Sequence, residues 1–222
     1  MMRLPIISAF VLLCGSNANA ESPCKSSPCI TVDVYYESLC GDSMMFIRNE
    51  LVPSYPDLKD YLNINFIPYG KASTKLEESK KYSFTCQHGP VECQGNKAQG
   101  CGYDAILNSG KTYEEKQSLA VAFIGCAMSS DNPGTAVPEC AKTTGLSEET
   151  RKVIDDCINS EKGDALLAGY GEKTHDLNPA LTSVPTIILD GVYSKENQRA
   201  AESNFKKLIC DRIPDKPAAC SK

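Results

Sequence analysis

Cysteine is the residue that most constrains how this chain can fold. The sequence holds 12 cysteines in 222 residues. One of them, Cys14, lies in a segment with the pattern of a secretory signal: Arg3, then an apolar run at 4–13, then the cleavage pattern Ala-Asn-Ala at 18–20. The other eleven belong to an expected mature chain, 21–222, that enters an oxidising compartment, where cysteines usually form a disulfide framework.

Eleven is an odd number, so at least one thiol is unpaired, capped or joined between chains. We expect five bridges within the chain and Cys40 left over. Most of the pairing cannot be deduced from spacing, but Cys24–Cys29 and Cys210–Cys220 are close enough in sequence to form local bridges at the two ends. The ten cysteines expected to pair are Cys24, Cys29, Cys86, Cys93, Cys101, Cys126, Cys140, Cys157, Cys210 and Cys220.

A zinc site is the alternative use of these cysteines, with Cys86, His88, Cys93 and Cys101 as ligands. The oxidising route argues against it, and we expect no metal and no cofactor. The charges are scattered, 23 basic against 28 acidic residues for a net charge of −5. With no basic block we expect no nucleic-acid partner, and no later segment is apolar enough for a membrane span.

The order of predicted elements indicates an α/β fold. Residues 30–36 are rich in β-branched and aromatic side chains and predict a buried strand, 42–51 predict a helix that Pro53 and Pro56 end, and 62–66 predict a second strand. Several helices follow in the cysteine-rich region at about 71–180, where Thr112 and Glu115 form a capping box and Ser147 is an N-cap.

Regular β signals return near the end of the chain. Residues 184–189 predict a strand, Asp190-Gly191 a tight turn into a second short strand at 192–193, and Ser194 the start of the last helix. The order is therefore βαβ, a helical insertion, then ββα. This is the layout of a thioredoxin-like fold with a helical, disulfide-rich insertion: a core from about 30–70 and 180–212, and an insert at about 71–180, in a single domain.

Cys40 stands where the first strand ends and the first helix begins. The positive end of a helix dipole favours the thiolate, which is the nucleophile in disulfide exchange. A dithiol reductase needs a second thiol three residues on to resolve the mixed disulfide, and this chain has Ser43 there. Asp42 adds a negative charge that opposes thiolate formation. Cys40 is then a vestigial or a monothiol nucleophile.

A second cluster spans residues 86–101. Its eight recurring positions match the signature CQHG-x2-EC-x2-N-x4-C of the gamma-interferon-inducible lysosomal thiol reductase (GILT) family, and the chain resembles that family over nearly all of its expected mature length. The matching residues are Cys86, Gln87, His88, Gly89, Glu92, Cys93, Asn96 and Cys101. His88 and Glu92 could suggest acid–base catalysis, but their place between closely spaced cysteines favours a structural role in a stapled loop.

The resemblance implies a redox motif at Cys40 and a substrate-side loop at Val184 and a cis Pro185. The chain departs from the family at three places: Ser43 replaces the second cysteine, and Leu181 and Thr186 stand where family members often carry histidine and tryptophan. No N-glycosylation sequon is present, so the family's glycan-tagged route to the lysosome is closed and secretion is expected.

Three functions remain open. The first is a secreted binding protein that has the fold of a reductase but has lost the activity. It would have an unidentified protein partner and, by family association, a role in host defence. The second is a monothiol disulfide reductase or isomerase that uses Cys40 with an external thiol. In the third, Cys40 joins two copies of the chain in a homodimer.

Overall fold

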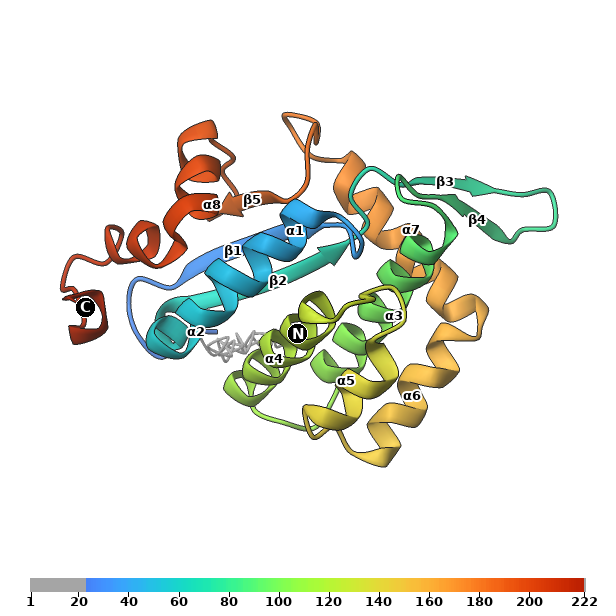
Figure 1. Ribbon diagram of the computed structural model, residues 1–222, viewed down its shortest axis with the longest axis horizontal. Coiled ribbons are helices and arrows are strands. Elements are labelled where there is room, and N and C mark those ends of the chain that lie inside the picture. Colours follow the sequence, from blue (N-terminus) through green and yellow to red (C-terminus); the bar gives the residue numbers. More distant parts are fainter. Residues whose placement is uncertain (1–22, 222) are drawn as a thin grey trace, which may run out of the picture.

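The computed structural model describes residues 23–221, so the predicted signal segment, with Cys14, lies outside it (Figure 1). A three-stranded sheet lies at its centre, in the order β2–β1–β5. The strands are β1 (Ile30–Tyr36), β2 (Leu62–Pro68) and β5 (Thr186–Leu189). β1 runs parallel to β2 and antiparallel to β5, so segments from both ends of the chain meet on it.

The two faces of the sheet differ as alternating side chains require. Val34 is aligned with Phe66 on one side and Ile187 on the other, and all three are buried in the core. On the opposite face Asn65 donates a hydrogen bond of 2.7 Å to the carboxylate of Asp33. The apolar face thus anchors the helices that follow β1.

The helix after β1 runs past both prolines that were expected to end it. It consists of α1 (Gly41–Met45), a π-helical turn (Phe46–Leu51) and α2 (Val52–Leu58). The prediction was wrong because Pro53 falls in the first turn of α2, where a missing N–H is tolerated, and the π turn before it shifts the hydrogen-bond register. The Glu50 carbonyl is satisfied by the Ser54 hydroxyl at 2.6 Å. A short 3₁₀ turn, Lys59–Tyr61, then leads into β2.

The region between β2 and β5 is mostly helical. It begins with a hairpin that the sequence did not predict, β3 (Ser73–Leu76) and β4 (Tyr82–Thr85). Five helices follow: α3 (Pro90–Leu107), α4 (Tyr113–Ser129), α5 (Val137–Thr143), α6 (Glu148–Ile158) and α7 (Glu161–His175). In Figure 1 they lie beyond β2, while α8 (Lys195–Cys210) lies beside β5. A final 3₁₀ turn spans Ala218–Ser221.

The predicted helix caps are confirmed. Thr112 and Glu115 form both halves of a capping box, and the Ser147 hydroxyl accepts from the Thr150 N–H. The strand predicted after the Asp190 turn is wrong: Val192 makes one bridge to Leu189 and no more. It has no room to lengthen, because Ser194 already caps α8.

Five disulfides staple the described chain, the number expected, and both local bridges are among them. Cys101–Cys157 joins α3 to α6, and Cys126–Cys140 joins α4 to α5. The full set is Cys24–Cys29, Cys86–Cys93, Cys101–Cys157, Cys126–Cys140 and Cys210–Cys220. The three cysteines of the zinc site considered from the sequence, Cys86, Cys93 and Cys101, are thus engaged in disulfides. Within residues 23–221, Cys40 is the cysteine without such a bond. No helix in this range is long and apolar enough to cross a membrane.

Candidate active site

Cys40 caps the N-terminus of α1, directly after the loop that leaves β1. Its backbone is extended, with φ −74° and ψ 120°, while its carbonyl already accepts the Met44 N–H at 3.0 Å. Its own N–H donates to the Glu37 carbonyl at 3.3 Å, so the loop is a tight turn. The Cys40 residue is 9% exposed. A thiol at a helix start is the arrangement in which a thiolate is stabilised by backbone dipoles.

The loop before β5 lies against this thiol. Because β5 pairs with β1, it brings the Val184–Pro185 peptide bond, which is cis, to the end of β1. The Val184 carbonyl lies 3.6 Å from the Cys40 sulfur. Two residues 144 positions apart thus meet, and the predicted pairing of Cys40 with the Pro185 loop is present as geometry.

Gln198 of α8 holds the Pro185 loop in place and was missed from the sequence. Its side-chain nitrogen donates to the Pro185 carbonyl at 2.8 Å, and its side-chain oxygen accepts the Ile187 N–H at 2.8 Å. Gln198 lies three residues before Ala201 of the buried stripe of α8. A polar side chain on an apolar helix face was the available signal, but it does not tell which carbonyl will be its partner.

Ser43 occupies the position that a resolving thiol would take. It is fully buried, and its hydroxyl has no hydrogen-bond partner among the described residues. A buried hydroxyl without a partner loses its hydrogen bonds to water and gains none within the protein, which costs free energy. The scaffold therefore still presents position 43 beneath Cys40, but with a group that has no redox chemistry.

Of the other departures from the family pattern, Leu181 and Thr186 both lie at one cavity. Its volume is about 440 Å³, and Pro179 and Tyr193 also line it. The Thr186 hydroxyl is used locally and donates to the Ser183 carbonyl at 2.7 Å. Asp42, by contrast, is exposed on α1 and lines a separate hollow with Met45.

The signature segment supports the redox loop from the other side. Asn96 of α3 accepts the Ser38 N–H at 2.8 Å, and the Ser38 hydroxyl donates to the Glu92 carbonyl at 3.1 Å. The Tyr36 hydroxyl donates to Gln99 at 2.8 Å, and burial, more than its tyrosine neighbours, holds the pKa of Tyr36 well above its ordinary value. Asn96, whose role the sequence left open, anchors the loop that carries Cys40.

Three charged side chains of this region meet at one point. The Nδ1 atom of His88 lies 2.5 Å from Glu92 Oε2 and 3.5 Å from Glu37 Oε2. The sequence placed His88 and Glu92 together, and Glu92 Oε1 does accept a backbone N–H, that of His88, at 3.0 Å. Glu37 was missed, since it is 51 positions from His88 and carries no local signal. Burial is the main cause that raises the pKa of the Glu37 carboxyl.

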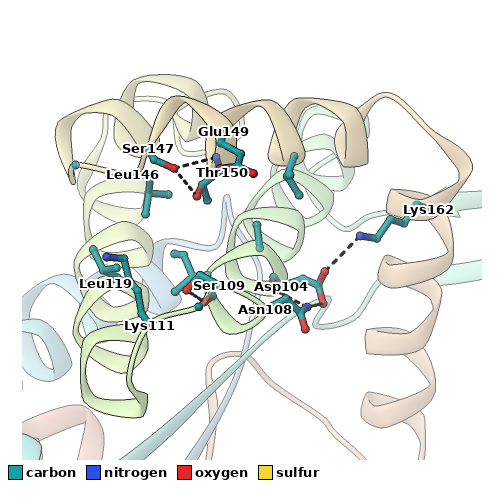
Figure 2. A pocket seen from close by; sticks show the side chains of 15 residues that line it. Asp104, Asn108, Ser109, Lys111, Leu119, Leu146, Ser147, Glu149, Thr150 and Lys162 are labelled. Carbon is teal, nitrogen blue, oxygen red and sulfur yellow. Dashed lines mark hydrogen bonds and ion pairs between the residues drawn. The ribbon is translucent and has the colours of Figure 1, made fainter.

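The predicted site residues therefore form two groups, one on each side of the loop between β1 and α1. Cys40, Ser43, Val184 and Pro185 lie on one side, and the signature residues lie on the other. A further pocket of about 510 Å³ between α3, α4 and α6 is lined by residues such as Asp104 and Lys162, whose side chains form an ion pair at 3.7 Å (Figure 2). None of the predicted site residues lines it.

Sequence comparison finds a family match over the part of the chain that carries Cys40 and the signature segment. Residues 31–144 match the family model described as "Gamma interferon inducible lysosomal thiol reductase (GILT)". A "Gamma-interferon-inducible lysosomal thiol reductase-like protein" of Anopheles gambiae is 33% identical over 89% of this chain and 82% of its own. "GILT-like protein 1" of Drosophila melanogaster is 34% identical over 86% and 78%. The "Gamma-interferon-inducible lysosomal thiol reductase" of Carassius auratus is 32% identical over 88% and 73%.

Structural comparison identifies the fold. The "MdbA protein, a thiol-disulfide oxidoreductase from Actinomyces oris" aligns with a TM-score of 0.55 at 11% identity, over 85% of this chain and 82% of that one. The corresponding protein of Corynebacterium matruchotii aligns with a TM-score of 0.50 at 17% identity, over 81% of each chain. The predicted thioredoxin-like fold is confirmed.

Proposed function

Because the chain belongs to the gamma-interferon-inducible lysosomal thiol reductase family, we propose that it is a member that has lost the dithiol reductase cycle and acts by binding a protein partner. Its family and fold relate it to thiol–disulfide oxidoreductases. The proposal concerns what this chain does with that scaffold, since a fold by itself does not fix an activity.

The observation that carries the proposal is the buried Ser43 hydroxyl. A dithiol reductase forms a mixed disulfide at its first cysteine and releases the substrate when the second thiolate attacks that bond. Ser43 lies at the second position, fully buried, and cannot make this attack. Cys40 is the free thiol of residues 23–221, so no other described cysteine can resolve the adduct.

Binding is the use that the remaining surface supports. The Pro185 loop is still held rigidly by Gln198, and the cavity beside it is lined by Leu181 and Thr186, the positions at which this chain departs from the family. A protein interface distributes its affinity over area and shape and needs no single sulfur. We propose an extracellular partner, with a role in host defence by family association and with secretion rather than lysosomal delivery, since the sequence has no N-glycosylation sequon.

Two measurements test this proposal together. The first is insulin reduction by the mature chain at acid and neutral pH, with and without glutathione; we expect no turnover without the added thiol. The second compares the wild type with Cys40→Ala in capturing the same partner from the native extracellular fluid, and we expect equal capture. Loss of capture by a folded Cys40→Ala protein, or efficient turnover without external thiol, would overturn the proposal.

A monothiol enzyme is the second candidate, and the position of Cys40 favours it. The sulfur still lies at a helix start, 3.6 Å from the carbonyl that precedes the cis Pro185. Cys40 thiolate would attack a substrate disulfide and release one substrate thiolate. An external thiol would then attack the Cys40 sulfur, which frees the second substrate thiol and leaves the external thiol bound to Cys40. A second external thiol would attack the sulfur of the bound one, which regenerates the Cys40 thiol and releases the two external thiols as their disulfide. Turnover that requires added thiol and vanishes in Cys40→Ala would establish this cycle.

A homodimer joined through Cys40 is the third possibility left from the sequence. The residue is only 9% exposed, so two copies could form this bond only after the loop opened. We therefore propose a Cys40 that is free in the folded chain. Non-reducing gel electrophoresis of the purified protein decides this point, because a covalent dimer that disappears in Cys40→Ala would contradict it.

A further inference from the structure

Two buried carboxylates of this protein face a single imidazole. Glu37 and Glu92 have no exposed side-chain surface, while the His88 side chain is 38% exposed. One donor atom from each of the three lies within 4.8 Å of the others. Even a protonated imidazole offsets only one of the two negative charges, and burial of an unmatched charge is costly. With both carboxylates ionised, the cluster has an excess of negative charge in a place shielded from solvent.

Each carboxylate is anchored by one oxygen and directs the other to the centre. Glu37 Oε1 accepts the Lys71 N–H at 2.7 Å, and Glu92 Oε1 accepts the His88 N–H at 3.0 Å. The second oxygen of Glu92 faces His88 Nδ1. The second oxygen of Glu37 is buried and has no hydrogen-bond partner among the described residues. A buried acceptor that faces two other potential ligand atoms and has no hydrogen bond is a group that a bound ligand would satisfy.

We propose that Glu37, His88 and Glu92 bind a zinc ion, with solvent completing the coordination on the open side of His88. Two carboxylates and a neutral imidazole carry a charge of −2, which a divalent cation cancels. Imidazole nitrogen with carboxylate oxygen is a donor set that suits zinc, whereas calcium and magnesium prefer oxygen alone. The proposal is independent of the function assigned to Cys40.

The distances are compatible with such an ion after a small movement. Zinc binds nitrogen and oxygen at about 2.0–2.2 Å, which places tetrahedral ligand atoms about 3.3 Å apart. Glu37 Oε2 and His88 Nδ1 are already 3.5 Å apart. His88 Nδ1 and Glu92 Oε2, at 2.5 Å, must separate by roughly 0.8 Å to reach that spacing. The half-exposed His88 ring can turn outward, because it is the member of the cluster with free space beside it.

The surroundings hold the ligands in position. A Cβ at Gly70 would lie 2.3 Å from Glu37 Cγ, so the absence of a side chain there lets the carboxylate reach the centre. The Cys86–Cys93 disulfide closes the segment that carries His88 and Glu92. Ligands oriented by further hydrogen bonds are a general feature of protein metal sites.

The test uses the mature, disulfide-bonded chain, stripped with a chelator and titrated with Zn²⁺ by calorimetry. We expect one ion per chain, and a cobalt-substituted form with the visible absorption of a four- or five-coordinate site. His88→Ala and Glu37→Gln should each lower zinc affinity at least about tenfold. His175→Ala is the matched control, since it removes the other histidine, which is not one of the three proposed ligands.

The variants must first show native disulfides and an unchanged near-ultraviolet spectrum. If Glu37→Gln does not fold, the half-exposed His88→Ala carries the test. No zinc binding by the wild type below millimolar concentration overturns the proposal and leaves a hydrogen-bonded His88–Glu92 pair. So does equal binding by wild type and His88→Ala, or an equal loss in His175→Ala.

Discussion

The loop between β1 and α1 carries a different polar site on each of its sides. Toward β5 lie Cys40 and Ser43, where the hydroxyl that replaces the second sulfur has no hydrogen-bond partner within residues 23–221. Toward α3 lie Glu37, His88 and Glu92, whose donors are all present and crowded. One site has a buried hydroxyl without a hydrogen-bond partner among the described residues, and the other has, with both carboxylates ionised, more negative charge than its own residues neutralise.

The two sites share this loop, which Asn96 of α3 holds at Ser38, but each site also has supports of its own. The Cys40 side is positioned by pairing of β1 with β5 and by Gln198, without any disulfide. The Glu37 side is positioned by α3 and by the Cys86–Cys93 staple. We therefore expect that loss of the resolving thiol removes chemistry from the Cys40 side without loosening the Glu37 side.

Removal of the signature staple should have the largest effect. The double variant Cys86→Ser/Cys93→Ser should lower the free energy of unfolding by roughly 2.5 kcal/mol, because the opened loop of about eight residues gains entropy in the unfolded chain. Denaturant unfolding measures this. The rate at which an alkylating reagent modifies Cys40 should stay unchanged, and a rate that rises with the mutation would show that the two sides are coupled after all.

Gly70→Ala should have the next largest effect. Gly70 has φ +60°, and the new methyl group would lie 2.3 Å from Glu37 Cγ. Backbone strain and the clash should together lower the free energy of unfolding by about 2 kcal/mol. Urea unfolding checks the value, and zinc affinity should fall in parallel if Glu37 is displaced. An unchanged midpoint would mean that the carboxylate moves aside freely.

Ser43→Cys tests the other side of the loop. Restoring the second thiol should raise thiol-driven insulin reduction at least about tenfold, equivalent to 1.4 kcal/mol of activation free energy, because the mixed disulfide can then be resolved. Ser43→Ala is the control: it removes the same hydroxyl and should give no activity. If Ser43→Cys is equally inert, the changes at Leu181, Thr186 and Asp42 also disable the site.

Gly41→Ala should have the smallest effect, with the opposite sign to Gly70→Ala. Gly41 is the first residue of α1, and a Cβ there would meet nothing within 4 Å. Alanine restricts the unfolded chain and suits a helix, so the free energy of unfolding should rise by about 0.5 kcal/mol. Thermal unfolding beside Gly70→Ala measures both signs in one series, and a destabilised Gly41→Ala would show that the Cys40 side is as tightly packed as the Glu37 side.

Local features of this protein were decided by the sequence itself. The first strand begins and ends where its β-branched and aromatic run does, at Ile30 and Tyr36. The Thr112 capping box, the Ser147 cap and the Cys24–Cys29 bridge form between residues at most five positions apart. Such features depend on neighbours along the chain, whose distance is fixed before the chain folds. The family signature at 86–101 is equally local and equally readable.

Tertiary structure decided what these pieces do together. No sequence pattern links Glu37 to His88 and Glu92, because their meeting requires α3 to pack beneath the β1–α1 loop. The same holds for Gln198 on the Pro185 carbonyl and for the π turn that carries the first helix past Pro53. Each depends on contacts between segments far apart in the chain or on hydrogen-bond register within a helix. Residue spacing and helix or strand propensity predict neither the long-range contacts nor the register. Which partner satisfies a buried polar group depends on the segments that pack against it.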